Sequence, residues 1–528
     1  MIESYKKHHG TFPHYDAIVI GSGVGSLTTA AMLSKEGKKV LVLEKHYTHG
    51  GFSHVFKRPG YEWDVGIHYI GEVGRDNSLT KKLFDYISDG TLEWGDMGDV
   101  YDRIVVGDKI YDFVKGVSNF KEQLVKDFPQ EEKAITKYID LVFKVVKTSR
   151  SFFGAKALHP VLQFLLGSFM KSPFLKFSSK TTLETMREIT DNEELIKVLV
   201  GQYGDYGLPP SKSSFAMHAM LVRHYFSGGY FPVGGSSRIA DSIVPIIRAT
   251  GGDVLVKADV LEILINNNCA EGVKMSDGKT LTADMIISGA GIINTYKHLI
   301  PDVVARRHTL EKNLQTISPS VAHISLYIGL NGNPKELNLP KANYWIYPED
   351  LSHDEVFDNY VEDVNSEFPV VYISFPSAKD PDWSNRYPGK STIDIITLMP
   401  YEIFEQWEDE RWKKRGEEYE QLKDRFAKRL LETLFKHEPH LRDKIDMYEL
   451  SSPLTTKHFV NYDKGEIYGI DHSPERFEQD FLQPRTPIKN LYLTGQDIAT
   501  AGIGGALISG VLTTSAILNK NMIKKVMR

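Results

Sequence analysis

Cysteine is nearly absent from the 528-residue sequence, which contains one, Cys269. A single thiol excludes an internal disulfide framework and any metal or iron–sulfur site built from several cysteines. No other group of potential ligands has a recognisable metal-binding spacing, so we expect no bound metal. Any redox chemistry therefore has to come from an organic cofactor.

An excess of basic charge is lacking as well. The formal net charge is −6, whereas nucleic-acid binding needs a surface that neutralises phosphates, so we expect no nucleic-acid partner. The composition, 41% hydrophobic and 25% charged, is that of a folded globular protein. Because the chain is too long for one ordinary core, we expect two or more lobes.

Long apolar runs are also missing. No stretch of about twenty apolar residues occurs, so we expect no membrane-spanning helix. Residues 1–14 are polar and lack the apolar core of a secretory signal. We therefore expect a protein of the cytoplasm or of the cytoplasmic face of a membrane.

Near the N-terminus the sequence predicts a strand, a glycine turn, a helix and a second strand. Tyr15 to Ile20 is a β-branched apolar run that ends at a glycine turn. Apolar residues recur at helical spacing over residues 24–36, and residues 39–43 form a second strand that ends at Glu44. This order is typical of a βαβ unit that binds a dinucleotide.

The glycine turn and Glu44 have the chemistry that a dinucleotide requires. Gly21, Gly23 and Gly25 allow the backbone to approach a pyrophosphate, and the helix N-terminus supplies free N–H groups. Glu44 can accept hydrogen bonds from ribose hydroxyls. Ser26 replaces the third glycine of the usual motif but is small enough for helix and strand to pack. A tight turn beside a solvated glutamate is the alternative, which the combined spacing disfavours.

A second glycine-rich loop lies near the C-terminus and favours FAD. A short strand over residues 490–493 leads into Gly495 and Asp497, and small residues over 502–506 precede an apolar helix that ends near residue 518. One carboxylate and little side-chain bulk suit ribityl hydroxyls and a flat ring. Close helix packing is the alternative explanation. The cofactor contacts expected here are Gly495, Asp497, Gly504, Gly505 and Ala506.

Asp64 to Gly71 contains the histidine that we expect beside the cofactor ring. Glycines flank His68 and its neighbours are apolar. His68, or Tyr69 beside it, could donate a hydrogen bond or a proton. A structural histidine with satisfied hydrogen bonds is an equally good interpretation.

Residues 151–180 combine many apolar side chains with lysines. The lysines are Lys156, Lys171, Lys176 and Lys180. Such a segment is typical of a helix that lies in a membrane interface. A core-facing helix with a solvated lysine edge is equally compatible with this pattern. In the membrane case the substrate is lipophilic and enters from the bilayer.

Several motifs spread over nearly the whole chain resemble those of the retinol saturases, within the larger group of phytoene desaturases and carotenoid isomerases. They are Gly21–Gly25, Asp64–Gly71, Gly228–Pro232, Gly234–Ser237, Phe375–Pro381 and Leu493–Asp497. The blocks around His68 and Phe375 resemble the saturase branch in particular. They favour reduction of the substrate over desaturation.

The resemblance implies an α/β fold with a Rossmann-like FAD-binding lobe of the amine-oxidase type and an interleaved α+β substrate lobe. We assign residues 14–77, 226–300 and 456–528 to the FAD lobe, and 78–225 and 301–455 to the substrate lobe. FAD rather than NAD is implied because a glycine pair passes close to the flavin end. The contacts expected in these further segments are Lys45, Gly50, Gly51, Phe52, Ser53 and Val260.

The implied activity is FAD-dependent reduction of a conjugated C=C bond in a lipophilic polyene, a retinoid or a carotenoid, at a membrane surface. The electron donor stays open. Desaturation or cis–trans isomerisation with the same FAD is the first alternative. A prenyl- or lipid-binding escort protein without catalysis is the second, which the intact glycine loop and Glu44 disfavour.

Overall fold

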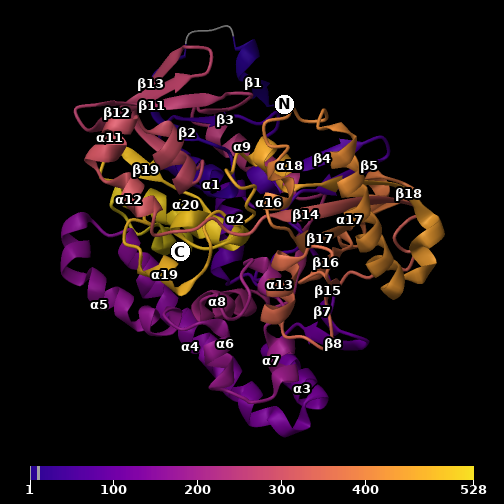
Figure 1. The fold of residues 1–528 in the computed structure, drawn as a ribbon. Helices are drawn as coiled ribbons and strands as arrows, with labels where there is room; N and C mark the ends of the chain where they lie inside the picture. Colours follow the sequence, from indigo (N-terminus) through magenta and orange to yellow (C-terminus); the bar gives the residue numbers. More distant parts are fainter. Residues whose placement is uncertain (1, 9–11) are drawn as a thin grey trace.

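The first of two lobes is built on an eight-stranded sheet (Figure 1). The computed structural model describes residues 2–8 and 12–528, so residues 1 and 9–11 of the polar N-terminal stretch lie outside the described part. The strand order is β1 (Glu3–Ser4), β10 (Asp253–Val256), β3 (Val40–Glu44), β2 (Tyr15–Ile20), β13 (Thr280–Ser288), β12 (Cys269–Met275) and β11 (Val260–Asn266), with β19 (Leu491–Leu493) beside β13.

Strands β1, β10, β3, β2, β13 and β19 pair in parallel, whereas β11, β12 and the start of β13 form an antiparallel meander. The sheet therefore combines strands from near the N-terminus, the middle and the C-terminus of the chain. Their carboxyl ends lie at one edge, where ligands of open α/β sheets bind.

Both faces of this sheet are covered, as buried parallel strands require. One face packs against α1 (Val24–Lys35), α2 (Leu79–Ser88), α9 (Ser237–Arg248), α20 (Gly502–Leu518) and α21 (Met522–Val526). The other packs against the meander and the short helices α10 (Ile292–Asn294), α11 (Asp302–Arg307) and α12 (Leu310–Leu314). Helix α2 thus packs with the first lobe, although its residues lie in a segment that we assigned to the substrate lobe.

The second lobe contains a seven-stranded sheet, on the right of Figure 1. Its order is β18 (Ile445–Ser451), β14 (His323–Asn331), β17 (Lys390–Leu398), β16 (Val371–Ser374), β15 (Asn343–Tyr347), β7 (Val100–Val106) and β8 (Lys109–Val114). Strand β7 pairs in parallel with β15, so two segments far apart in the sequence share this sheet.

Helices cover the second sheet and extend below it in Figure 1. Helix α17 (Gly416–His437) packs against β16 and β18 and shares an apolar core with β14 and β17. Six helices form the lower group: α3 (Val117–Asp127), α4 (Glu132–Lys156), α5 (Pro160–Ser178), α6 (Thr182–Arg187), α7 (Glu193–Leu199) and α8 (Phe215–Tyr225). No helix of the described residues is long and apolar enough to span a bilayer.

Short elements complete the fold. Two further sheets have two antiparallel strands each: the hairpin of β4 (Val55–Arg58) with β5 (Tyr61–Asp64), and the long-range pair of β6 (Trp94–Asp96) with β9 (Tyr230–Pro232). The remaining helices are α13 (His353–Glu362), α14 (Pro376–Lys379), α15 (Trp383–Arg386), α16 (Glu402–Glu405), α18 (Pro453–Val460) and α19 (Pro474–Glu478).

Candidate functional site

A cavity of about 1170 Å³ is lined by residues of both lobes. It begins at the carboxyl ends of β2 and β3 and reaches the inner surface of β15, β16 and β17. The predicted site residues that line it are Gly21, Gly23, Gly25, Ser26, Glu44, Lys45, Gly50, Gly51, Phe52, Ser53, His68, Tyr69, Val260, Gly495, Gly504, Gly505 and Ala506. Asp497 lies outside this wall.

The first glycine loop connects β2 to α1. Helix α1 begins without a side-chain cap, so its first N–H groups are free to bind a ligand. A Cβ atom on Gly23 would meet no atom within 4 Å, whereas one on Gly25 would lie 2.9 Å from the Cα atom of Gly495. Gly23 therefore leaves room in the cavity, and Gly25 allows the two glycine loops to touch.

Ser26 fits at the position of the missing third glycine because Gly289 lies opposite. A Cβ atom on Gly289 would be 1.9 Å from the Ser26 hydroxyl. Ser26 is buried, and Gly289 follows β13 directly beside the end of β2. The bulk that Ser26 adds on α1 is thus accommodated by a glycine on the neighbouring strand end.

Glu44, at the end of β3, organises the loops around it. Its carboxylate accepts hydrogen bonds from the Ser22 N–H (2.9 Å), the Ser22 hydroxyl (2.6 Å) and the His46 N–H (2.7 Å). The Gly50 N–H in turn donates to the Ser22 hydroxyl oxygen at 3.0 Å. A carboxylate has about four lone-pair sites, so one stays available for a ribose hydroxyl. Ser22 is not among the site residues that the sequence predicts. Its place between two glycines is the one sequence feature that points to this role.

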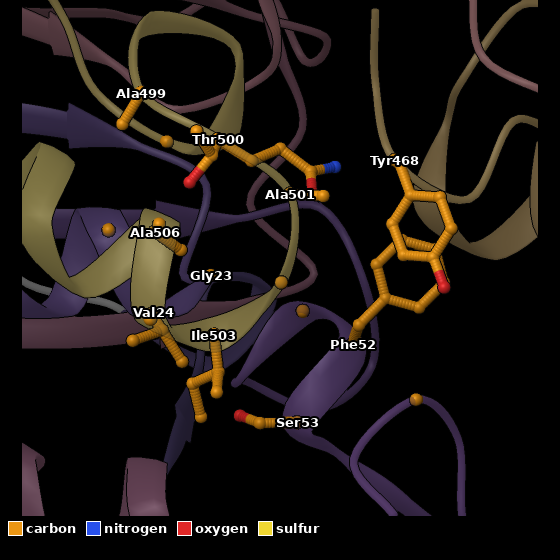
Figure 2. Close-up of a pocket in the computed structure, with 18 of the residues that line it drawn as sticks. Gly23, Val24, Phe52, Ser53, Tyr468, Ala499, Thr500, Ala501, Ile503 and Ala506 are labelled. Carbon is orange, nitrogen blue, oxygen red and sulfur yellow. The ribbon is translucent and has the colours of Figure 1, made fainter. Parts of the chain in front are cut away.

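The second glycine loop enters the cavity between β19 and α20. Gly495 has a φ of 106°, and α20, like α1, begins without a side-chain cap. Figure 2 shows Ile503 and Ala506 at the start of α20 near Gly23 and Val24, with Thr500 and Ala501 in the loop above. Two helix N-termini therefore contribute free N–H groups to the same end of the cavity.

Asp497 has a different position from the one that the sequence predicts. Its carboxylate accepts the N–H groups of Ile292 (2.8 Å) and Ile470 (3.1 Å), which ties the C-terminal loop to two distant segments. Gln496, the residue before it, lines the cavity and donates to the Tyr462 hydroxyl at 3.2 Å. Gln496 and Thr500 are thus the polar side chains by which this loop lines the cavity.

His68 lies in the cavity wall, where its side chain is only 10% exposed. Burial, together with the nearby Lys379, lowers the pKa of His68 to about 3, so the imidazole is neutral at pH 7. Neither ring nitrogen has a hydrogen-bond partner among the described residues. The carboxyl group of Asp394, whose pKa burial raises well above its ordinary value, lies 3.5 Å from Nδ1. A neutral imidazole is therefore free to bind a ligand.

Lys379 connects the block around His68 with the block around Phe375, the two blocks that resemble those of the saturases. Its ammonium donates to the His68 carbonyl oxygen at 3.0 Å, to the Ser374 hydroxyl at 2.7 Å and to the Asn343 side-chain oxygen. Burial lowers the pKa of Lys379 to about 7. The block around Phe375 thus fixes the backbone at His68.

Aromatic side chains line the end of the cavity away from the glycine loops, which we call the aromatic chamber. They are Tyr69, Tyr225, Trp345, Tyr372 and Tyr468. Tyr69 stacks on Tyr225 with ring centres 4.2 Å apart, and Trp345 lies 4.4 Å from Tyr372. In Figure 2, Tyr468 and Phe52 lie on the right, away from Ile503 and Ala506 at the start of α20. Flat apolar walls of this kind suit a flat apolar ligand.

Helix α5 exposes apolar side chains to solvent. Phe164 is 88% and Phe169 82% exposed, and the other exposed members are Val161, Leu162, Leu165 and Leu166. Helix α4, which packs against α5, contributes Phe143 and Phe153 to the cavity wall. A core-facing helix does not leave such residues uncovered.

Lys156 is not part of a solvated basic edge. It is buried at the end of α4, where its ammonium donates to the Ile498 carbonyl oxygen at 3.2 Å. Burial lowers the pKa of Lys156 well below its ordinary value. The basic residues that accompany the exposed apolar face are therefore Lys171, Lys176 and Lys180.

Comparison with known proteins places residues 19–87 in the family of NAD(P)-binding Rossmann-like domains. All-trans-retinol 13,14-reductase from Danio rerio is 38% identical over 96% of this chain and 86% of its own length. An inactive all-trans-retinol 13,14-reductase from the same organism is 33% identical over the same shares. Prolycopene isomerase 1 from an Oncidium hybrid cultivar is 27% identical over 94% of this chain and 83% of its own.

Among solved structures, cyclohexylamine oxidase from Brevibacterium oxydans is similar in fold. It has a TM-score of 0.59 and 16% identity, over 98% of this chain and all of the other. The expected Rossmann-like lobe with an interleaved second lobe of the amine-oxidase type is thereby confirmed. So is the resemblance that the sequence motifs indicated.

Proposed function

The chain belongs to the all-trans-retinol 13,14-reductase family of oxidoreductases, and on that premise we propose that it binds FAD and reduces a conjugated C=C bond of a lipophilic polyene. The substrate class is a retinoid or a carotenoid. The observation that carries the proposal is the single cavity that joins two glycine loops to an aromatic chamber. A dinucleotide cofactor and an apolar substrate therefore meet in one space.

The residues at the end of the cavity that contains both glycine loops fit FAD. Two uncapped helix N-termini supply N–H groups for the pyrophosphate, and Glu44 keeps a site for a ribose hydroxyl. Val260 and Lys45 line the end beside Glu44, and Phe52 and Gly504 line the way to the chamber. FAD, when bound, supplies two-electron redox chemistry. The chain's own residues bind it, exclude water and orient the polyene.

Isomerisation is the second candidate, because the prolycopene isomerases are similar over nearly the whole chain. The inactive relative shows that membership of the family does not by itself guarantee turnover. The three outcomes that the cavity allows, reduction, desaturation and isomerisation, differ in the hydrogen count of the product.

Anaerobic incubation of the flavin-loaded protein with retinol or with a carotenoid, under chemical reduction of the flavin, distinguishes these outcomes. We expect the product to gain two hydrogens by mass spectrometry, and the control without reductant to leave the polyene unchanged. A loss of two hydrogens in the control, where the flavin is oxidised and can accept a hydride, favours desaturation. An unchanged mass with altered double-bond geometry favours isomerisation. A purified protein that stays colourless after reconstitution with FAD contradicts the cofactor assignment.

We also propose that α5 rests on a membrane surface from which the polyene enters. Six exposed apolar residues on one helix suit the interface of a bilayer, and the exposed Lys176 on the same helix suits anionic headgroups. Helix α4 connects this face to the cavity wall, because it packs against α5 and lines the cavity with Phe143 and Phe153. A water-insoluble substrate then does not need to cross the aqueous phase.

A further inference from the structure

The hydroxyl of Tyr69 lies between two carboxyl groups in the wall of the aromatic chamber. It is 2.9 Å from Asp102 Oδ2, on β7, and 3.1 Å from Asp205 Oδ2, in the short 3-10 turn Tyr203–Asp205. Asp205 and Tyr69 line the cavity, whereas Asp102 is fully buried behind them. Neither the glycine motifs nor the family blocks contain Asp205.

A count of protons shows which carboxyl group is neutral. A phenol has one hydrogen to donate, so it satisfies only one of two carboxylates. Asp102 also receives N–H groups from Gln202 (2.6 Å) and Asn343 (2.8 Å), which stabilise its charge. Among the described residues, Tyr69 is the one side chain recorded as a hydrogen-bond partner of Asp205. Tyr69 therefore donates to Asp102, and a protonated Asp205 donates to Tyr69.

The electrostatic surroundings agree with this assignment. Burial, and then the charge of Asp102, raise the pKa of Asp205 to about 8, while burial raises the pKa of Asp102 to about 6. The titratable groups that face Asp205 are Asp102 on β7, Tyr347 on β15, Tyr372 on β16, Tyr225 on α8, and Tyr69, Tyr206 and Tyr468. At neutral pH Asp205 thus presents a carboxylic acid to the cavity.

We propose that Asp205 is the general acid that protonates the polyene, and that Tyr69 is the residue that positions it. The proposal rests on the reductive function stated above. FAD, when bound and reduced, would supply the hydride that one carbon of the C=C bond needs. The O–H bond of Asp205 breaks and a C–H bond forms at the other carbon, which completes the saturated product and leaves a carboxylate. The Tyr69 hydroxyl can then turn from Asp102 to that carboxylate, because Gln202 and Asn343 keep Asp102 hydrogen-bonded, and water restores the proton after product release.

Asp205→Asn tests the proposal because it keeps the size of the side chain and removes the acid. We expect turnover to fall by about 10²-fold or more, the usual contribution of a general acid. Flavin content and polyene binding, measured by quenching of protein fluorescence, stay at the level of the unchanged protein. Asp205→Glu restores part of the rate. Because Asp205 acts as an acid, turnover of the unchanged protein falls as the pH rises through about 8, and Asp205→Asn lacks this alkaline limb.

A second readout needs neither substrate nor turnover. The infrared difference spectrum between neutral and alkaline pH contains the C=O band of a carboxylic acid that loses its proton near pH 8. We expect this band to lose the contribution of Asp205 in Asp205→Asn and to keep its full intensity in the control Asp471→Asn, a part-buried carboxyl group outside the cavity wall. The buried carboxyl groups of Asp394 and Glu466, whose pKa burial also raises, account for any band that remains in Asp205→Asn. Tyr69→Phe moves the midpoint to higher pH, because the ionised Asp205 then loses the hydroxyl that turns to its carboxylate.

Three results would overturn the proposal. One is an infrared band that Asp205→Asn leaves intact, and another is full turnover by that variant. The third is weaker polyene binding with an unchanged rate for bound substrate, which makes Asp205 an anchor for the substrate rather than an acid. If the unchanged protein reduces no polyene, the proposed function fails, and the infrared band alone still decides whether Asp205 holds a proton.

Discussion

Ionisable side chains around the aromatic chamber have protonation states that differ from those in water. Burial lowers the pKa of His68 to about 3 and that of Lys379 to about 7, and raises that of Asp205 to about 8. Each shift favours the uncharged form, because a charge in an apolar wall loses its hydration. The aromatic chamber can therefore hold an apolar polyene and still have polar groups in its wall.

His68 is expected to orient a ligand rather than to supply a proton. Replacing His68 by Ala removes one neutral hydrogen bond, so turnover falls by up to about tenfold while flavin content stays normal. Because the imidazole is already neutral, the rates of the unchanged protein show no His68 inflection near its ordinary pKa of 6.5. Steady-state rates against pH, with flavin content read from the visible spectrum, measure both.

The matched control for this change is His440→Ala, which removes a part-exposed histidine that does not line the cavity. It is expected to leave turnover unchanged. Unchanged turnover in His68→Ala as well would exclude His68 from the reaction. An inflection near pH 6.5 that disappears with His68 would contradict the neutral imidazole.

At the scale of elements, the exposed face of α5 predicts binding to vesicles. Replacing Phe164 and Phe169 by Ser removes two large apolar side chains, each worth about 1.5–3 kcal/mol when buried, so binding weakens by more than about tenfold. Co-sedimentation with vesicles of phosphatidylcholine and an anionic lipid measures this loss. Thermal stability stays the same because both rings are already exposed to solvent.

Val303→Ser is the control, because Val303 is an exposed apolar residue on α11 rather than on α5. It is expected to leave vesicle binding unchanged. Equal binding by the double variant and the unchanged protein would exclude α5 as the membrane contact. A monomer–dimer equilibrium that the double variant alone shifts would instead identify this face as a protein interface.

Helices and strands whose bounds depend only on local sequence signals are predicted well. The helix expected over residues 24–36 is α1 (Val24–Lys35), and the strand expected over 39–43 is β3 (Val40–Glu44). Glycines and apolar periodicity are local, so they mark these bounds directly.

Contacts between distant segments leave no such local signal. The parallel pairing of β7 with β15 joins residues more than two hundred positions apart. Asp497 cannot be placed from its motif alone, because its partners are the N–H groups of Ile292 and Ile470. Asp205 stands in no recognisable motif, and its chemistry arises only when the fold brings Tyr69 and Asp102 beside it.

At the scale of the whole molecule, the proposed cofactor site is assembled from segments that are separate in the sequence. The residues around Gly23, Val260 and Gly495 line one cavity, and residues of the second lobe line its other end. A ligand that contacts all of them can bind the folded chain but not the unfolded one. Folding and cofactor binding are therefore thermodynamically linked.

FAD is accordingly expected to raise the unfolding temperature of the flavin-free protein in a concentration-dependent way. At a free concentration of about 100 times Kd, the gain in unfolding free energy is about 2.7 kcal/mol. Circular dichroism against temperature measures it, with NAD at the same concentration as the control that the proposal expects to have little effect. Glu44→Gln reduces the shift, because a neutral amide accepts the Ser22 and His46 N–H groups and a ribose hydroxyl more weakly. An equal shift with NAD and FAD contradicts a site built for a flavin, because the aromatic end would then contribute nothing to recognition of the cofactor.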